Sequence, residues 1–271
     1  VALNLKALGA KTLLAGVIGE DTKGDIFLDL LKEQQIGYEG IVRLKNRPTI
    51  SKTRIIAGSH HILRVDEEDK QNINEAAQAL FMEKINDLFH KNSVDVVIFE
   101  DYDKGVLSKE LIAEVIDFAQ EHHIPTVVDP KKRNFLNYQN ATLFKPNLKE
   151  LKEGLNIQFD SKDPAELAMA VNMLIETLEV KGAFVTLSEQ GVFINFKDEE
   201  KHIPAHIRQI ADVSGAGDTV ISVVAVCIAA GLSIFEAAKL GNLAGGLVCE
   251  QVGVVPIDKS LLLKEAELVE N

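Results

Sequence analysis

A short glycine-containing segment directly before an apolar run carries the most specific chemistry in this sequence. The segment Asp212–Thr219 reads DVSGAGDT, and a helix-forming apolar stretch follows at once. Glycines allow a tight turn close to a ligand, and the amides from Gly215 to Asp218, with Ala216 and Gly217 between them, would form the start of the helix. Such amides bind phosphate or an oxyanion, and Asp218 beside them could accept a proton from a substrate hydroxyl. The same residues also suit a plain helix cap with an acidic first turn.

Asn147 and Glu150 form a second candidate pair. They follow a short apolar run that ends at Lys145-Pro146, and at a helix start a spacing of three places them on one face. An amide and a carboxylate so placed could organise Mg²⁺ through water beside phosphates. The spacing is also that of a capping box, in which the two residues only close the helix end. The sequence supports both interpretations.

Two charged segments follow other strand-like runs. Phe99–Gly105 reads FEDYDKG, and Asp129–Arg133 reads DPKKR. In open α/β sheets ligands bind at the carboxyl ends of the strands, so Asp101 and Lys104 could contact sugar hydroxyls or a phosphate. Lys131 could likewise dock an anionic substrate. An ordinary charged surface loop is the alternative for both segments.

Short apolar runs that alternate with helical segments must position these groups. The strand-like runs cover residues 12–18, 94–99, 125–128, 142–144 and 183–187, and helical spacing marks residues 21–34 and 108–122. This alternation predicts an α/β fold, with a doubly wound, mostly parallel sheet and helices on both faces. From Gly215 on, the sequence is nearly all helical.

Residues 41–66 interrupt the alternation of strands and helices, because they contain no convincing helix. Ser51–Ala57 and His60–Val65 read as two strands around a Gly58-Ser59 turn, which predicts an antiparallel hairpin. We place this small β insert at residues 38–66 of one domain that spans residues 1–271. Such an insert often forms a lid over a site.

The composition excludes several classes of protein. The chain has 271 residues, and its 29 basic and 41 acidic residues give a net charge of −12, which argues against a nucleic-acid or anionic-membrane partner. No apolar run reaches the length of a membrane span. Cys227 and Cys249 lie in apolar helical sequence and are expected to be free thiols, which suits a cytoplasmic location.

With these motifs in this order, the sequence resembles the ribokinase-like (PfkB) sugar kinases. The family's C-terminal signature is Asp-Thr-x-Gly-Ala-Gly-Asp before a long helix, and here Val213 stands where the family often has Thr. The family's Asn-x-x-Glu motif matches Asn147 and Glu150. The resemblance implies a carbohydrate kinase that uses ATP and Mg²⁺, with Asp218 as the base and a monovalent cation as a further activator in parts of the family. It also implies a homodimer that pairs its β lids.

Within the family, the likeness is greatest to bacterial kinases of the ADP-heptose pathway. The segments that carry it are residues 47–54, 63–66, 101–105, 129–131, 140–143, 146–150 and 188–191. Those enzymes phosphorylate the anomeric hydroxyl of D-glycero-β-D-manno-heptose 7-phosphate. The alternatives are a related kinase for fructose 6-phosphate or ribose, and a non-catalytic relative that binds sugar or nucleotide. A dehydrogenase is disfavoured, since no Gly-x-Gly-x-x-Gly follows the first strand.

The resemblance and the charge pattern together nominate binding residues. Residues expected at the nucleotide are Ser188, Glu189, Gly191, Asp212 and Asn242. Residues expected at the sugar phosphate are Asp101, Lys104, Lys131, Arg54 and Arg64. The family's first strand, with its sugar-binding Asp, and its Gly-Gly-x-x-x-Asn motif should precede Val1 and are absent from the numbered chain. No His-x-Gly-His motif of a fused adenylyltransferase is present either.

Overall fold

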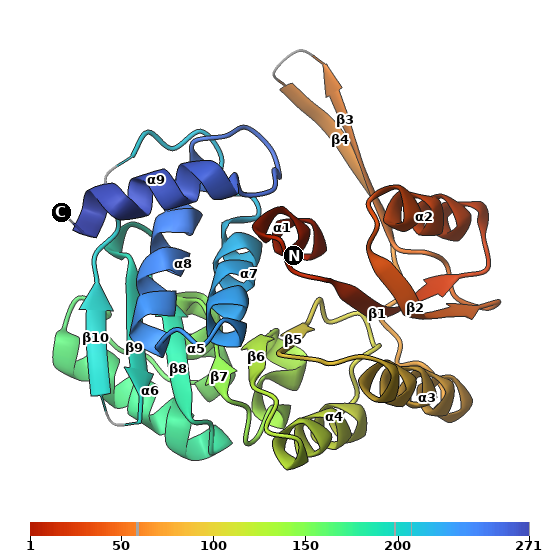
Figure 1. Ribbon diagram of the computed structural model, residues 1–271, viewed down its shortest axis with the longest axis horizontal. Helices are drawn as coiled ribbons and strands as arrows, with labels where there is room; N and C mark the ends of the chain where they lie inside the picture. The colour runs from red at the N-terminus through yellow and green to blue at the C-terminus, as the bar shows by residue number, and fades with distance from the viewer. Residues whose placement is uncertain (58–59, 198, 207, 271) are drawn as a thin grey trace. The chain divides into compact units, whose positions relative to one another are not determined.

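The chain folds into two compact units in the computed structural model (Figure 1), which describes residues 1–57, 60–197, 199–206 and 208–270. The first unit comprises Val1–Ala10, Val94–Tyr102 and Ile112–Asn271. The second unit comprises Lys11–Ser93 and Asp103–Leu111. Each unit is described by itself below.

The second unit contains a parallel pair of strands and two helices. Strand β1 (Leu13–Gly19) pairs with β2 (Gly37–Leu44), and α2 (Thr22–Glu33) connects them. Helix α3 (Glu75–Lys91) packs against both strands. Asp21 caps α2 by accepting a hydrogen bond of 2.7 Å from the amide of Gly24. The strand and the helix predicted at residues 12–18 and 21–34 are therefore confirmed, with small shifts at their ends.

An antiparallel hairpin follows in the same unit. Strand β3 (Ser51–Ala57) pairs with β4 (His60–Glu67), in a register that sets Arg54 opposite Arg64. The predicted hairpin is confirmed, but its turn residues 58–59 lie outside the described residues. Strand β2 covers the first part of the 38–66 segment and pairs with β1, because buried Gly40 and Val42 anchor it in the parallel pair.

Buried polar contacts fix the segment that leads into the hairpin. The guanidinium of Arg47 donates to the backbone carbonyls of Gln71, Asp69 and Lys104, and only 7% of the residue is exposed. The amide and the hydroxyl of Thr49 both donate to the Asp21 carboxylate, at 2.8 and 2.7 Å. These bonds tie residues 47–49 to the start of α2 and to the segment after the hairpin.

The first unit is built on a six-stranded sheet with the order β10-β9-β8-β7-β6-β5. Its strands are β5 (Val97–Glu100), β6 (Thr126–Asp129), β7 (Leu143–Phe144), β8 (Gly182–Thr186), β9 (Val192–Phe196) and β10 (Glu199–Ile203). The four strands from β5 to β8 are parallel, and β9 and β10 are antiparallel additions at one side. All four residues of β6 are buried, so both faces of the sheet are covered. The predicted α/β fold is confirmed.

Helices supply that cover. In the first unit they are α1 (Ala2–Leu8), α4 (Lys109–Glu121, which starts in the second unit), α5 (Leu148–Leu155), α6 (Pro164–Leu178), α7 (Ala216–Ala229), α8 (Ile234–Cys249) and α9 (Lys259–Glu270). Helices α7 and α8 lie side by side, and a Cβ at Gly241 would come within 2.8 Å of Val224 (Figure 1). Strand β5 starts at Val97, whereas the sequence predicts a strand from residue 94. Val97 is the first residue of this segment that pairs with a neighbouring strand, and its partner is Thr126.

Helix α1 is tied to α7 through one buried side chain. Asn4 donates to the Thr219 hydroxyl at 3.0 Å and accepts from the Ile257 amide at 2.9 Å. Cys227 and Cys249 are free thiols, the first buried and the second partly buried. Among the described residues, no helix combines the length and the apolar character that a membrane crossing requires.

Candidate active site

The carboxyl ends of four neighbouring strands bring polar side chains to one edge of the first unit's sheet. Strands β5 to β8 are parallel and adjacent, so their ends meet at the same edge. Glu100 ends β5, Asp129 ends β6, Lys145 follows β7, and Ser188 lies shortly after β8. This edge is where open α/β sheets bind their ligands.

Helix α7 contributes a third carboxylate to this edge. One oxygen each from Glu100, Asp129 and Asp218 lies within 4.8 Å of the other two. The buried ammonium of Lys145 lies 2.9 Å from Asp129 Oδ2. The three residues Glu100, Asp129 and Asp218 are called the carboxylate cluster below.

The carboxylate cluster carries more negative charge than Lys145 compensates. Glu100 Oε2 is buried and has no hydrogen-bond partner among the described residues. Burial, followed by the charges of Asp129 and Asp218, raises the pKa of Glu100 to about 8. The cluster must therefore hold a proton or a cation near neutral pH. Carboxylate oxygens are the ligands that Mg²⁺ prefers, so these residues fit a divalent cation.

The start of α7 leaves backbone donors beside the cluster. Gly215 has φ of +83° and forms the N-cap, a conformation that glycine adopts without strain. The amide of Ala216 donates to the Val213 carbonyl at 3.3 Å, whereas the amides of Gly217 and Asp218 have no acceptor in the described part of the chain. A Cβ built on Gly217 would lie 3.8 Å from Lys145 Nζ and 3.9 Å from Asp129 Oδ2, so this helix start lies next to the Lys145–Asp129 pair. Two donors thus point away from the helix, as in anion-binding helix starts.

Tyr102 and Asp212 support the Asp218 region from two sides. The Tyr102 hydroxyl donates to Asp218 Oδ2 at 3.4 Å, and burial, then the charges of Glu100 and Asp218, raises the pKa of Tyr102. The phenol therefore stays protonated as a donor. The two oxygens of Asp212 accept from the amides of Ser214 (2.9 Å) and Gly253 (3.1 Å), which lowers the pKa of Asp212. Asp212 thereby shapes the loop before α7.

Asn147 and Glu150 form the capping box that their spacing allowed. Asn147 Oδ1 accepts from the Glu150 amide at 2.8 Å, and Glu150 Oε2 accepts from the Asn147 amide at 2.9 Å. The second oxygen, Glu150 Oε1, accepts from Lys131 Nζ at 2.7 Å, and the same ammonium lies 3.5 Å from Asp129 Oδ1. Lys131 therefore connects the box to the carboxylate cluster.

Two other nominated residues are occupied by internal contacts. Asp101 is buried, and its Oδ2 accepts from Asn134 Nδ2 at 3.0 Å and from the Tyr138 hydroxyl at 2.8 Å. Asn242 is buried on α8 and donates to the Pro204 carbonyl at 2.9 Å. Both side chains thus fix local structure.

The nominated residues after β8 form a tight turn. Ser188 and Glu189 belong to a short 3-10 helix, and Gly191 has φ of +87°. A Cβ at Gly191 would come within 2.1 Å of the Ile203 carbonyl oxygen, so only glycine fits there. The turn lies at the same edge as the carboxylate cluster, because β8 is parallel to β6 and β7.

The remaining nominated residues lie in the second unit. Lys104 Nζ is 2.7 Å from Glu68 Oε2, and both side chains are largely buried. Arg64 forms a bidentate pair with Asp66, with both bonds at 2.7 Å, while Arg54 faces Arg64 across the hairpin. The sugar-phosphate candidates are therefore divided between the two units.

Sequence reasoning missed four members of this site. Glu100, Asp129 and Lys145 were not nominated individually, although each lies at or just after the end of an apolar run. Their common signal is a charged residue at the end of neighbouring parallel strands. Tyr102 was missed as well, and only the fold brings its hydroxyl to Asp218.

Sequence comparison defines the class of protein. The sequence model described as pfkB family carbohydrate kinase matches residues 1–259. The chain therefore belongs to the PfkB family of carbohydrate kinases, enzymes that transfer a phosphoryl group to a sugar hydroxyl. Among curated proteins it is similar to the bifunctional protein HldE of Geobacter sulfurreducens (36% identity over 254 residues) and of Sulfurimonas denitrificans (39% over 261 residues). These matches cover 93% and 96% of this chain but 51% and 54% of the relatives, so the chain spans about half their length.

Solved structures share the fold. Phosphofructokinase-2 from Escherichia coli in complex with potassium matches with a TM-score of 0.83 and 17% identity, over 100% of this chain and 86% of that one. Ribokinase from Thermotoga maritima matches with a TM-score of 0.70 and 18% identity, over 97% and 85% of the two chains. At these identities the likeness shows the ribokinase-like fold alone.

Proposed function

We propose that this chain phosphorylates the anomeric hydroxyl of D-glycero-β-D-manno-heptose 7-phosphate, with ATP as the phosphoryl donor. The observation that carries the kinase chemistry is the position of Asp218, beside two free amides at the start of α7 and within the carboxylate cluster. The likeness of the motif segments to heptose-7-phosphate kinases and the curated HldE relatives support this sugar.

Asp218 is the base in this proposal. Its carboxylate accepts the proton of the attacking hydroxyl, whose oxygen forms the new bond to the γ-phosphorus while the bond to the β–γ bridging oxygen breaks. The amides of Gly217 and Asp218, with Gly215 and Ala216 shaping the turn, donate to the charge that develops on the phosphoryl oxygens. Tyr102 holds one carboxylate oxygen and leaves the other for the proton.

The carboxylate cluster and the capping box are the proposed cation sites. Bound Mg²⁺ neutralises negative charge on the phosphates during transfer. Oxygens of Glu100 and Asp129 would hold the ion directly, and Asn147 and Glu150 would hold it through water. The orphaned Glu100 Oε2 supports this role for the cluster. A monovalent cation as a further activator stays part of the proposal, and an Escherichia coli phosphofructokinase-2 structure contains potassium.

The nucleotide is proposed to lie along the turn after β8 and the loop before α7. Its nominated neighbours are Ser188, Glu189, Gly191, Asp212 and Asn242. The side chains of Val213 and Val254 are exposed in this region, and the methyl Cγ1 of Val254 lies 3.1 Å from a Cβ built on Gly215. Exposed apolar side chains beside a phosphate-binding helix start suit an adenine ring.

The residues proposed for the sugar phosphate are the nominated charged residues, each considered within its own unit. These are Asp101 and Lys131 in the first unit, and Lys104, Arg54 and Arg64 in the second. Arg54 and Arg64 take opposed register positions in the hairpin, and Arg64 pairs with Asp66, so the support for this part of the proposal is the gathering of positive charge on the hairpin. Asp101 would contribute to sugar binding indirectly, because its carboxylate holds the side chains of Asn134 and Tyr138 by hydrogen bonds.

A cytoplasmic homodimer that pairs the hairpins is also proposed. Ile55, Leu63 and Val65 on the hairpin are about half exposed, and a second copy would cover them. We expect light scattering at micromolar concentration to give a dimer mass, and Leu63→Lys to give a monomer. A monomer mass for the unaltered chain would contradict this arrangement.

Product analysis tests the proposed substrate. The chain is supplied with MgATP and with heptose 7-phosphate, fructose 6-phosphate or ribose, and the release of ADP is measured. Turnover with the heptose alone is expected. Turnover with another sugar would keep the kinase chemistry and replace the substrate, and ADP release without any sugar would contradict both.

A further inference from the structure

A buried amide on helix α1 lies outside the motif segments. Asn4 is 6% exposed and is the buried residue of this helix, whereas Leu3 beside it is 46% exposed. This reverses the usual preference, because burial normally favours the apolar side chain. Burying an amide also costs free energy unless its polar atoms find partners. The position of Asn4 therefore directs attention to the hydrogen bonds that it makes.

Asn4 joins two segments that are far from each other in the sequence. Its Nδ2 donates to the Thr219 hydroxyl at 3.0 Å, and its Oδ1 accepts from the Ile257 amide at 2.9 Å. Thr219 follows Asp218 directly in the first turn of α7 and is 1% exposed. Ile257 is buried as well and lies in the loop between α8 and α9. Both bonds are thus shielded from water, where a hydrogen bond holds its partners more firmly than at the surface.

The two segments meet again at Gly215, the N-cap of α7. The Thr219 amide donates to the Gly215 carbonyl at 2.9 Å, so the first turn of the helix is closed onto its cap. From the loop after α8, Val254 Cγ1 lies 3.1 Å from a Cβ built on Gly215. Asn4 therefore holds both sides of the turn that carries Asp218.

We infer that Asn4 is a positioning residue for phosphoryl transfer. It fixes the first turn of α7 against the loop after α8, so that the Asp218 carboxylate and the amides of this turn keep the alignment that transfer needs. The action of Asn4 passes through Thr219 and Ile257. The inference rests on the proposed function, in which Asp218 is the base.

A purely structural role of Asn4 predicts a different result. An amide that only stabilised the fold would lower the unfolding temperature when it is lost, but each folded molecule would still react at the ordinary rate. Loss of positioning instead lowers kcat and leaves the KM values for ATP and the sugar nearly unchanged, because the misaligned group acts in the transition state.

Thr219→Val tests the bond between Asn4 and α7. Valine keeps the branched shape of threonine and removes the hydroxyl, while the bond from Ile257 to Asn4 stays in place. With MgATP and heptose 7-phosphate, we expect kcat to fall about tenfold or more and both KM values to stay within about twofold. Thr219→Ser returns the hydroxyl without the methyl group. It should recover most of the kcat although it is less stable than the unaltered chain.

Asn4→Ala removes both bonds and should lower kcat at least as much as Thr219→Val. The double variant Asn4→Ala/Thr219→Val should lose no more kcat than Asn4→Ala, because the two side chains act through one shared bond. Thermal unfolding confirms that each variant is folded at the assay temperature. If Asn4→Ala does not fold, Thr219→Val and Thr219→Ser carry the test.

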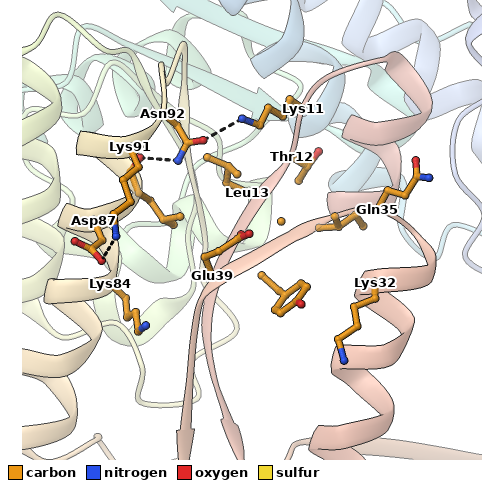
Figure 2. Close-up of a pocket in the computed structure, with 14 residues that line it drawn as sticks. Lys11, Thr12, Leu13, Lys32, Gln35, Glu39, Lys84, Asp87, Lys91 and Asn92 are labelled. Carbon is orange, nitrogen blue, oxygen red and sulfur yellow. Dashed lines mark hydrogen bonds and ion pairs between the residues drawn. The ribbon is translucent and has the colours of Figure 1, made fainter.

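Asn92 provides a matched control in the second unit. Its Nδ2 donates to the Leu88 carbonyl and its Oδ1 accepts from Lys11 Nζ, both at 3.0 Å, so this amide also joins two segments. Figure 2 shows its contact with Lys11 at a cavity of about 740 Å³ that contains none of the nominated site residues. Asn92→Ala should leave kcat and both KM values unchanged.

The unaltered chain is measured first, and the sugar used for the variants is the one that supports its turnover. The inference is overturned if folded Thr219→Val keeps the kcat of the unaltered chain, or if Thr219→Ser loses as much kcat as Thr219→Val. Losses of kcat that multiply in the double variant, or an equal loss in Asn92→Ala, would overturn it as well. If the unaltered chain turns over no sugar, the proposed function fails and the inference fails with it.

Discussion

At the scale of single residues, the chemistry of the site is determined by several charged groups that lie within a few ångströms of one another. Asp218 has the Tyr102 hydroxyl on one oxygen, two carboxylates within 4.8 Å and free amides of its own helix start. Lys145 is buried against Asp129 and compensates only part of this charge. The arrangement therefore has capacity both for a cation and for a phosphoryl group.

Tyr102→Phe tests the positioning of Asp218. Loss of one hydrogen bond to a carboxylate should lower kcat roughly 5- to 10-fold, with little change in KM for either substrate. Steady-state kinetics measure both constants, and Tyr38→Phe in the second unit is the matched control. An unaltered kcat would show that the phenol does not orient the base.

Glu100→Gln tests the cation site. The amide preserves the size of the side chain and removes its acid, so the Mg²⁺ concentration needed for half-maximal activity should rise about tenfold or more. The measurement is a Mg²⁺ titration at saturating ATP and sugar, with the exposed Glu114→Gln as control. If both variants respond to Mg²⁺ like the unaltered chain, Glu100 is not a ligand.

The sequence predicted part of this site. The glycine segment and the Asn147–Glu150 pair are local patterns, so their spacing alone places Asp218 and the capping box at helix starts. Glu100 and Lys145 were missed because their meeting depends on the order of β5, β6 and β7 in the sheet, which no local pattern specifies.

At the scale of elements, capping and buried polar contacts define where segments begin. Asp21 caps α2 and accepts two bonds from Thr49, which fixes the start of the helix and the segment before the hairpin together. The alternation of strands and helices was readable from apolar periodicity. Strand β2 is harder to predict, because its sequence, GYEGIVRL, contains two glycines and two charges and its pairing with β1 is a long-range property.

The pH dependence of stability tests this role of Asp21. Bonds from the Thr49 amide and hydroxyl and from the Gly24 amide lower the pKa of Asp21 to about 2. Because the folded pKa lies below the unfolded value of about 3.9, the stabilisation is present above pH 4 and is lost as the pH falls towards 2.

Asp21→Asn should therefore be less stable than the unaltered chain at pH 7, and the difference should shrink as the pH falls from 4 towards 2. Urea unfolding of both proteins at a series of pH values measures this difference in the free energy of unfolding. Asp117→Asn, an exposed change on α4, is the control. A difference that stays constant over this range would contradict the assignment.

At the scale of the whole molecule, the candidate site residues belong to two compact units. The carboxylate cluster, the start of α7 and the turn after β8 belong to the first unit, whereas the hairpin belongs to the second. A net charge of −12 coexists with local basic groups in both units. The global charge therefore argues against a nucleic-acid partner, but it cannot locate the proposed anion sites.

The most direct test of the account is single-turnover phosphoryl transfer by Asp218→Asn with MgATP and heptose 7-phosphate. The amide preserves the shape of the side chain but cannot accept the proton, so the rate should fall roughly 10²- to 10⁴-fold while ATP still binds. Asp117→Asn, an equal change on the exposed face of α4, should leave the rate unchanged. A rate for Asp218→Asn equal to that of the unaltered chain would contradict the central claim that Asp218 is the base.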